Sequence, residues 1–369
     1  MKIRCNTHDL INGVNIVQKA VSSKTTMPIL KGIMIKAASN KLTLTGNDLN
    51  IGIENHIDTE IEEEGAIVVS SKLFGEIIRK LPGDTVEIFV DDNNNVHINC
   101  NYSKFELVGQ LPDEFPLLPE VDESNTISMN RELLKNMIRQ TIFATATGDT
   151  RPILTGTLMK IEDGMISMVA LDGYRLAIRM ANIVGTDNNS AIIPAKTLSE
   201  VSKIISGIEN SDDIKINISE KHIMFNFDDI KVVSRLLEGE FIKYSQMIPK
   251  EYKSKVVVNT NELLNSIERA SLVAREGRNT SIKISIKDDF MNISSNVEIG
   301  SVNEDVKINL EGDDLIIGFN PKYLIDALKV IDSEEVILEL SSSVSPCIIK
   351  PLDNENYIYL VSAVRIPKQ

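Results

Sequence analysis

Acidic pairs are the side chains of this sequence whose type could support catalysis. Adjacent carboxylates can hold two metal ions for hydrolysis or phosphoryl transfer. Four such pairs occur: Asp91-Asp92, Asp212-Asp213, Asp228-Asp229 and Asp313-Asp314. Their neighbours are turn-forming residues, which favours solvated hairpin tips over a metal site. An enzyme that handles nucleotides through these acids stays open as an alternative.

Other catalytic signals are absent from the sequence. The four histidines are scattered, and no phosphate-binding loop, HExxH or GxSxG motif occurs. The three cysteines, Cys5, Cys100 and Cys347, are far apart and lack CxxC spacing, which argues against a disulfide framework or a zinc site. We expect them to be small buried hydrophobes. We therefore expect no catalytic site, no metal and no cofactor.

Basic residues recur at one spacing and point to a different chemistry. Three short predicted helices each begin with a lysine and carry a second base seven residues later: Lys72 and Arg79, Lys196 and Lys203, Lys322 and Lys329. Seven residues are two helical turns, so each pair lies on one face. Such a stripe would neutralise phosphates without reading bases. A single lysine at a helix start is ordinary solvation, but its recurrence in three places favours a surface that faces nucleic acid.

The elements that position these helices form an internal repeat. Asn6-Thr-His-Asp-Leu-Ile-Asn12 returns as Asn259-Thr-Asn-Glu-Leu-Leu-Asn265 and, more briefly, at Asn130. Residues 27–36 match residues 151–160, and Asp48 matches Asp172, both with a shift of 124. Each copy of about 123 residues predicts a strand, a helix, alternating strands, a second helix and further strands. The fold class is therefore α+β, with three repeated domains at residues 1–122, 128–248 and 249–369.

Composition limits what such repeats can bind. The formal charge is 39 − 53 = −14, which opposes binding of nucleic acid or an anionic membrane through the general surface. Tryptophan is absent and aromatic residues make up 5%, so a base-stacking platform is poorly supplied. Any nucleic-acid site must then be local, on a surface that equivalent helices share. No apolar run reaches the roughly 18 residues of a membrane span, and we expect a cytosolic protein.

Several motifs together resemble the bacterial DNA polymerase III beta subunit family, the DNA sliding clamps. They are Thr25-Thr-Met-Pro-Ile-Leu-Lys-Gly32, Thr150-Arg-Pro-Ile-Leu-Thr-Gly156, Leu171-Asp-Gly-Tyr-Arg-Leu-Ala177, Gly239-Glu-Phe-Ile-Lys-Tyr244 and Ala363-Val-Arg365. The resemblance covers the whole chain. It implies three clamp domains, each with two helices on antiparallel sheet, that form half of a six-domain, head-to-tail dimeric ring. It also implies a non-catalytic subunit that encircles duplex DNA, makes the replicative polymerase processive and docks the clamp loader and repair proteins.

The resemblance carries two sets of site residues onto this chain. With the repeated bases, the positions that would face DNA are Lys24, Lys72, Arg79, Gly148, Arg151, Pro152, Ile153, Lys196, Lys203, Arg275, Lys322 and Lys329. The positions that would form a pocket for partner peptides are Leu154, Leu171, Gly173, Tyr174, Arg175, Leu176, Ile242, Met247, Pro346, Leu360, Val364 and Arg365. The aliphatic members would make an apolar groove, and Arg175 and Arg365 would hold polar groups of the peptide. Read without the resemblance, the same aliphatic residues are typical of plain core packing.

Some positions depart from the family pattern. Leu171 replaces a common threonine, Ser362-Ala363 replaces a more apolar tail, and Pro367-Lys368-Gln369 extends it. Gly148 has no side chain to offer a phosphate. A repeat-built scaffold that binds proteins and not DNA is the remaining alternative. Any Mg²⁺ would belong to the polymerase or to the loader's nucleotide.

Overall fold

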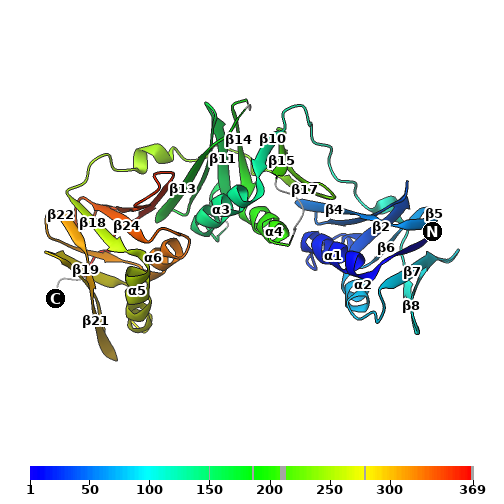
Figure 1. Cartoon of the computed structure of the whole chain (residues 1–369), viewed down its shortest axis with the longest axis horizontal. Coiled ribbons are helices and arrows are strands. Elements are labelled where there is room, and N and C mark those ends of the chain that lie inside the picture. Colours follow the sequence, from blue (N-terminus) through cyan, green and yellow to red (C-terminus); the bar gives the residue numbers. More distant parts are fainter. Residues whose placement is uncertain (149, 185–186, 208–212, 278–279, 367–369) are drawn as a thin grey trace. The chain divides into compact units, whose positions relative to one another are not determined.

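The computed structural model describes residues 1–148, 150–184, 187–207, 213–277 and 280–366 (Figure 1). Asp212 and the extension at 367–369 lie outside these ranges. Within them the chain forms six α-helices, two in each repeat, and its strands pair in antiparallel fashion. The predicted α+β class and the two helices per repeat are confirmed. The helices are α1 Thr7–Val17, α2 Ser71–Ile78, α3 Arg131–Thr141, α4 Ala195–Ile205, α5 Thr260–Ala274 and α6 Pro321–Leu328.

The strands follow the repeats closely. The first repeat contains β1 Lys2–Asn6, β2 Gly32–Ala38, β3 Lys41–Asn47, β4 Ile51–Asp58, β5 Glu60–Glu63, β6 Gly65–Ser70, β7 Thr85–Val90, β8 Asn95–Cys100 and β9 Ser103–Val108. The second contains β10 Ile127–Asn130, β11 Gly156–Glu162, β12 Met165–Leu171, β13 Arg175–Asn182, β14 Asn189–Pro194, β15 Asp213–Ile218, β16 His222–Phe227 and β17 Ile230–Arg235. The third contains β18 Ser254–Asn259, β19 Ile282–Lys287, β20 Phe290–Val297, β21 Gly300–Lys307, β22 Asn309–Gly312, β23 Leu315–Phe319, β24 Glu335–Leu340, β25 Cys347–Pro351 and β26 Tyr357–Val361.

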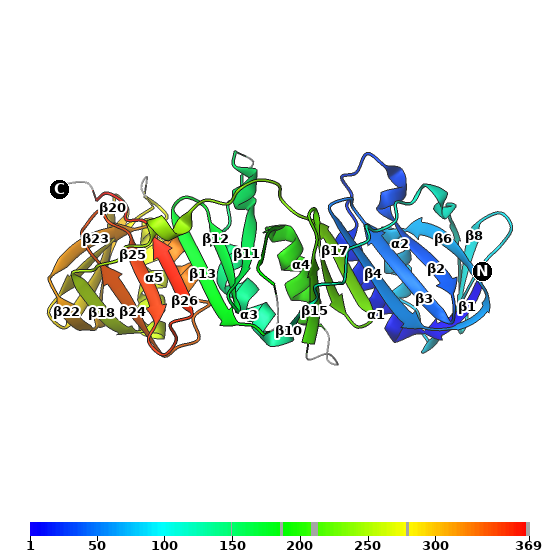
Figure 2. The ribbon, with the colours of Figure 1, turned by 90° about the horizontal axis from the view of Figure 1, so that it is seen from above.

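The sheets cross the borders between repeats. The second repeat divides its strands, since β10, β15, β16 and β17 join β4, β3, β2 and β6 in one sheet. Its other strands, β11 to β14, join β26, β25, β24, β18 and β22 in another (Figure 2). The connecting ladders are β17 with β4, where Val233 pairs with Gly52, and β13 with β26, where Leu360 pairs with Leu176.

Contacts accordingly group the chain into two compact units. The first is Met1–Leu133 with Lys196–Leu236, and the second is Leu134–Ala195 with Leu237–Gln369. Each unit holds one of the shared sheets and one sheet from a single repeat, which is β5-β1-β7-β8-β9 in the first unit and β21-β20-β19-β23 in the second. The domain borders placed at 122, 128 and 248 stay predictions, because these units follow the shared sheets and not the repeats.

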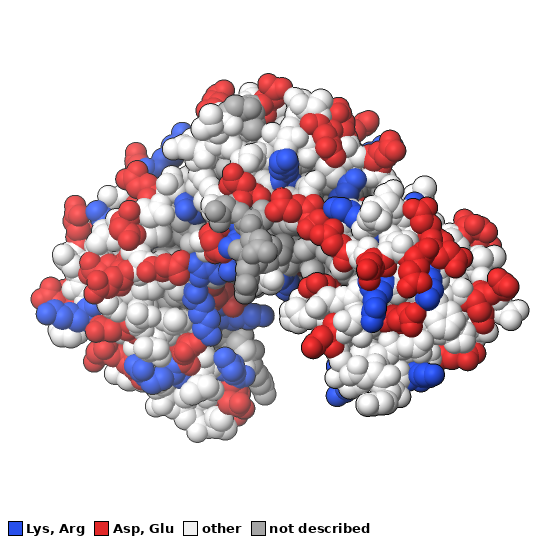
Figure 3. Space-filling view, turned by 45° about the vertical axis from the view of Figure 1, so that its right-hand side comes forward, with Lys and Arg blue, Asp and Glu red and all other residues white. Residues whose placement is uncertain are grey.

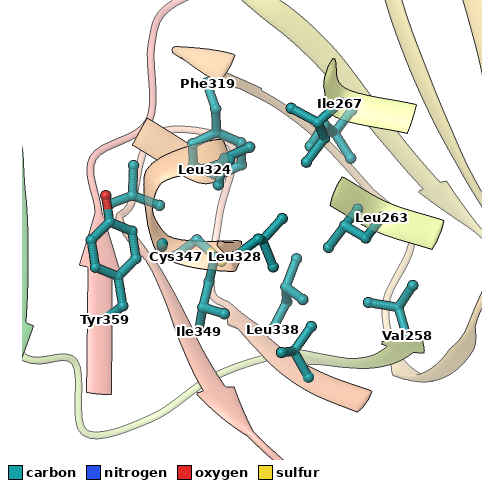
Figure 4. Close-up of a cluster of buried hydrophobic side chains, with 14 of the residues drawn as sticks. Val258, Leu263, Ile267, Phe319, Leu324, Leu328, Leu338, Cys347, Ile349 and Tyr359 are labelled. Atoms are coloured by element: carbon teal, nitrogen blue, oxygen red, sulfur yellow. The ribbon is translucent and has the colours of Figure 1, made fainter. Parts of the chain in front are cut away.

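Buried aliphatic side chains stabilise each unit. In the second unit, α5 and α6 lie side by side and pack their apolar faces on the sheet (Figure 4). Leu263 and Ile267 of α5 meet Leu324 and Leu328 of α6, and all four are at most 2% exposed. Tyr359 is buried beside them and donates its hydroxyl hydrogen bond to the carbonyl of Tyr323 at 2.8 Å. Burial of each such side chain contributes about 1.5–3 kcal/mol to folding.

The cysteines are buried, as the sequence predicted. All three cysteines are free and buried. Burial raises the pKa of the Cys5 thiol to about 12, so it stays protonated at neutral pH. Among the described residues, no helix has both the length and the apolar character needed to cross a membrane.

The repeated asparagine of the sequence has a structural role at helix starts. Asn6 and Asn259 are the N-caps of α1 and α5, and each side chain accepts from two backbone N–H groups of the first turn. Asn130 accepts in the same way from the backbone N–H groups of Glu132 and Leu133 at the start of α3. An N-cap satisfies donors that have no partner within the helix. The repeat therefore retains asparagine because each first helix needs this cap.

Replacement of Asn259 by alanine tests this role. The loss of the cap should cost about 1 kcal/mol and lower the melting temperature of the chain by about 2–4 °C. Asn259→Asp should melt close to the original chain because aspartate caps equally well. Asn261→Ala, at an exposed position of the same helix, is the matched control. Equal melting of the two alanine variants in a thermal scan would contradict the assignment.

Candidate functional site

The three lysines that the repeat aligns occupy equivalent places in the structure. Lys72, Lys196 and Lys322 are each the second residue of α2, α4 and α6, and all three are exposed. The second helix of each repeat follows directly on a strand, which fixes where the lysine emerges. The lysines that the sequence repeat aligns therefore occupy the same helix position in the structure.

The second base of each pair is engaged with a neighbour. Arg79 donates to Asn15 Oδ1 and Gln18 Oε1 of the adjoining helical segment, both at 2.9 Å. Lys203 and Lys329 form ion pairs at 2.7 and 2.8 Å with Glu200 and Glu268. Both lysines are 56% exposed, so these ion pairs contribute little energy and a phosphate could compete for the bases.

Lys196 differs from the other two lysines because it binds a buried carboxylate. Its Nζ lies 2.6 Å from Oδ2 of Asp48, whose side chain is 6% exposed. Oδ1 of Asp48 accepts the backbone N–H groups of Asn50 and Ile51 and so shapes the turn between β3 and β4. Lys196 comes from the second repeat and Asp48 from the first. This lysine therefore ties two repeats together within the first unit, a role that the stripe pattern did not reveal.

The remaining positions predicted to face DNA lie mostly at the surface. Lys24, Gly148, Arg151, Pro152 and Arg275 are exposed. Ile153 is half-buried and packs against an apolar cluster. Figure 3 shows acidic side chains spread over the drawn face with basic ones interspersed, consistent with the formal charge of −14. That the basic positions share one DNA-facing surface stays a prediction.

The residues predicted to form the partner pocket all belong to the second unit. Leu154, Leu171, Leu176 and Leu360 pack in one cluster, to which Ile242 adds from the following linker. The hairpin of β12 and β13 and its neighbour β26 bring them together through the pairs Leu171–Leu176 and Leu176–Leu360. These four leucines are between 1% and 5% exposed, so they form a floor that is closed to water.

Other members of the predicted pocket are less buried than these leucines. Tyr174 is 63% and Met247 42% exposed, so a ligand could reach both side chains. Gly173 has φ of 97°, a backbone conformation that favours glycine, at the tip of the β12–β13 hairpin. Pro346 and Val364 are half-buried and Arg365 is exposed. The N–H of Val364 donates to the carbonyl of Gly318 at 2.8 Å, which holds the C-terminal segment against β23.

The guanidinium of Arg175 is engaged within the chain, which limits the peptide-binding role expected for it. Its Nε donates to Asp172 at 2.9 Å, and its two terminal nitrogens donate at 2.6 Å to Asp326 and to the carbonyl of Phe143. Its carbon lies 4.6 Å from the ring centre of Tyr323. Burial opposes the charged form, but the hydrogen bond with Asp326 and the surrounding charges outweigh it and raise the pKa of Arg175.

This network contains residues that sequence reasoning did not assign. Phe143, Tyr323 and Asp326 hold Arg175 between the second and third repeats, and Tyr174 stacks on Tyr323 with ring centres 6.3 Å apart. Burial raises the pKa of Tyr323 above its ordinary value. The only sequence feature that could have pointed to Tyr323 is its position directly after Lys322 in the repeated block. Asp172 is equivalent to Asp48 in the repeat. Both aspartates accept backbone N–H groups of a hairpin turn, and both bind a base at a repeat border.

The acidic pairs occupy turns, strand ends and short connections. Asp91 follows β7 and accepts the backbone N–H groups of Asn93 and Asn95, which lowers the pKa of its carboxyl to about 2. Asp228 lies between β16 and β17 with φ of 59°. Asp313 and Asp314 connect β22 to β23. In the described part of the chain, no group of three His, Cys, Asp or Glu side chains could hold a metal ion.

Family models match the chain in three consecutive segments. The N-terminal, central and C-terminal domains of the DNA polymerase III beta subunit match residues 1–119, 128–243 and 245–365. The chain belongs to this family. The resemblance found in the sequence motifs is therefore confirmed.

Curated and solved relatives agree over their full lengths. The beta sliding clamp of Bacillus subtilis is 40% identical over 99% of this chain and 100% of its own. A DNA polymerase III beta subunit structure from Eubacterium rectale is 43% identical with a TM-score of 0.95, covering 99% of this chain and 100% of its own. The sliding clamp structure from Bacillus subtilis is 39% identical with a TM-score of 0.96, covering 100% of both chains. The three-domain clamp fold is thus shown for this chain.

The clamp fold makes the Lys196–Asp48 pair testable against an unpaired lysine. Lys196→Met leaves Asp48 without its cation and should cost about 1 kcal/mol, seen as a melting temperature about 2–4 °C lower. Lys72→Met, at the equivalent helix position, should melt within about 1 °C of the original chain, since most surface substitutions are nearly neutral. Thermal unfolding of the two variants at low salt compares them directly. Equal stability would show that the pair contributes nothing.

Proposed function

We propose that this chain is a DNA sliding clamp. Two copies form a closed ring around duplex DNA, make the replicative polymerase processive and dock the clamp loader, polymerases and repair proteins. The observation that carries the proposal is that two sheets continue across the repeat borders, while two others contain strands of one repeat only. These two, β5-β1-β7-β8-β9 and β21-β20-β19-β23, are called unpaired half-sheets below. The clamp fold of the whole chain supports the same conclusion.

The two unpaired half-sheets are complementary by repeat symmetry. Within the chain, β4 pairs with β17 and β13 pairs with β26. The strand equivalent to β4 and β13 in the third repeat is β21, and the strand equivalent to β17 and β26 in the first is β9. Both are edge strands. A head-to-tail contact between two copies would pair β21 of one with β9 of the other, and a second identical contact would close the ring.

The register of that contact follows from the two observed ladders. Ile51 pairs with Ser234 and Arg175 pairs with Val361. The same offsets applied to β21 and β9 place Gly300 opposite Leu107 and Val302 opposite Phe105. One apolar pair is thus predicted at the centre of the intermolecular ladder.

A second apolar contact supports the same arrangement. In the second unit, Phe143 packs on Tyr359 with ring centres 5.7 Å apart. The equivalent positions at the chain ends are Leu272 and Phe105. Leu272 is 63% exposed on α5, and Phe105 is 37% exposed on β9. Exposed apolar side chains at both edges are what an interface between copies would bury.

A ring explains the charge balance of the chain. A duplex that is enclosed does not need tight binding, so a few local lysines at the helix starts suffice and the acidic exterior limits nonspecific contact with DNA. Processivity then comes from topology, and the chain itself performs no catalysis and needs no cofactor. We propose that the protein acts in the cytoplasm, where bacterial replication proteins act.

Partner proteins would dock on the leucine floor of the second unit. A short peptide that contacts the exposed Met247 and Tyr174 could direct its apolar side chains toward Leu171, Leu176 and Leu360. A Pseudomonas aeruginosa sliding clamp has been crystallised bound to griselimycin; it is 26% identical to this chain, with a TM-score of 0.94, and covers 99% of this chain and 100% of its own. We propose that griselimycin binds this chain at the same floor, which makes it a practical probe.

Ring closure can be tested by placing a charge at the predicted interface. Leu272→Asp removes about 1.5–3 kcal/mol of burial from each of the two contacts, so sedimentation should show monomers at concentrations where the original chain is dimeric. After loading onto nicked circular DNA by a bacterial clamp loader, the original chain should stay bound and be released when the DNA is linearised. Leu272→Asp should not be retained.

A matched substitution separates the interface from general surface effects. Leu352→Asp alters an exposed leucine that lies on neither edge strand, and it should leave both dimerisation and retention unchanged. Retention of the Leu272→Asp variant would contradict the proposed contact. If the original chain fails to stay on circular DNA, the alternative hypothesis of a scaffold that binds only proteins would be favoured.

The partner pocket can be tested with griselimycin. Leu176→Ala combined with Met247→Ala removes two apolar contacts and should weaken binding at least about tenfold. Calorimetric titration measures the affinity and the number of sites, with one site expected per original chain. Arg365→Ala, at the exposed end of the pocket, should weaken binding less. An unchanged affinity of the double variant would refute the pocket assignment.

A further inference from the structure

The chain contains two equivalent repeat junctions, and they are filled differently. The first lies where β4 meets β17, and the second where β13 meets β26. At the second junction Leu171, Leu176 and Leu360 form the floor of the proposed pocket. Their equivalents at the first junction are Asn47, Gly52 and Val233. None of the three leucines is thus present at the first junction, and a different segment occupies the space.

The chain's own linker fills the first junction. Leu118 approaches Gly52 so closely that a Cβ added to the glycine would lie 2.1 Å from Leu118 Cδ2. Leu118 also packs against Met224 and Val233. Its side chain therefore takes the place that Leu176 occupies at the second junction, and any larger residue at position 52 would force Leu118 to move.

The segment Phe115–Val121 has the contacts of a bound peptide. It contains no helix or strand, and three of its side chains point inward at a spacing of three residues. Val121 is 7% exposed and Leu118 is half-buried, and both belong to the junction cluster, whereas Phe115, 4% exposed, packs in a separate cluster of the first repeat. The intervening Leu117 is 82% exposed. Apolar anchors that alternate with solvated positions are typical of a linear peptide in a groove.

A polar contact fixes the backbone of this segment. Asn47, which is 4% exposed, donates from its side-chain amide to the carbonyl of Pro116 at 3.1 Å. Its side-chain oxygen accepts the N–H of Leu49 at 2.8 Å. The equivalent residue at the second junction is Leu171, whose side chain has no polar atom. The residue that holds the linker at the first junction is therefore absent where partners are proposed to bind.

We propose that the segment Phe115–Val121 is an intramolecular ligand of the first junction. By occupying this junction it leaves each chain with one partner pocket, although the repeats create two equivalent junctions. Asn47 and Gly52 determine which junction is taken, because one holds the linker backbone and the other makes room for Leu118. This inference rests on the proposed function in one respect, which is the identification of the second junction as a partner pocket.

Peptide complementation tests the proposal on the full-length chain. In one variant, residues 115–121 are replaced by seven Gly and Ser residues, which empties the first junction while the chain stays connected. The probe is a fluorescein-labelled synthetic peptide of residues 113–122, measured by fluorescence anisotropy. The emptied variant should bind one peptide per chain, and the original chain should bind at least about tenfold more weakly because its site is filled.

Two neighbouring leucines of the probe provide a matched control. A probe with Leu118→Ala should bind the emptied variant about tenfold or more weakly, since the leucine sits on Gly52. A probe with Leu117→Ala should bind unchanged. Equal effects of the two substitutions, or no binding to the emptied variant, would overturn the proposal. If the emptied variant fails to fold, Leu118→Ala with Val121→Ala in the chain serves instead, and hydrogen exchange at residues 115–121 should rise at least about tenfold relative to Leu117→Ala.

Griselimycin separates this proposal from the proposed function. Saturating griselimycin should leave the probe bound to the emptied variant, because the two ligands use different junctions. Displacement of the probe would show that it binds the second junction and would overturn the proposal. If griselimycin does not bind the original chain but the probe still binds the emptied variant, the partner pocket fails while the intramolecular ligand stands.

Discussion

Backbone hydrogen bonding across the repeat borders is the interaction on which the rest of this structure depends. The ladders β17–β4 and β13–β26 merge half of one repeat with half of the next. Each merged sheet buries leucine, isoleucine and valine against the helices, so the border is as well packed as the interior of a repeat. The leucine floor exists because the second of these ladders sets β26 beside β13.

Ion pairs also stabilise the same repeat borders. Asp48 and Asp172 each shape a hairpin turn, and each binds a base that links it to the neighbouring repeat: Lys196 belongs to that repeat, and Arg175 reaches Asp326 in it. The first border uses the exposed Lys196, whereas the second encloses Arg175 between Asp172 and Asp326. The second arrangement is the more rigid of the two, since burial strengthens a hydrogen-bonded ion pair and makes its loss costly. Equivalent positions thus stabilise two borders with different surroundings.

Local patterns in the sequence predicted the parts of the fold that depend on near neighbours. The shift of 124 residues placed β11 to β14 by analogy with the first repeat, and the lysines at positions 72, 196 and 322 are all second residues of helices. The sequence could not predict the sharing of sheets, because any strand of similar pattern could pair with β4 or β13. Nor could it predict the partners of Lys196 and Arg175, which are brought near by the fold from positions 148 and 151 residues away. The pocket residues came from family resemblance, since buried leucines alone indicate only a core.

The division of the second repeat between two sheets separates the unit of duplication from the unit of folding. A fragment that followed the repeat borders would carry two half-sheets, each cut along a ladder that is internal in the whole chain. Unpaired internal strands attract other strands and promote aggregation. A fragment cut at the repeat borders is therefore expected to aggregate more readily than the whole chain. Such a fragment would need further copies of itself to pair these strands.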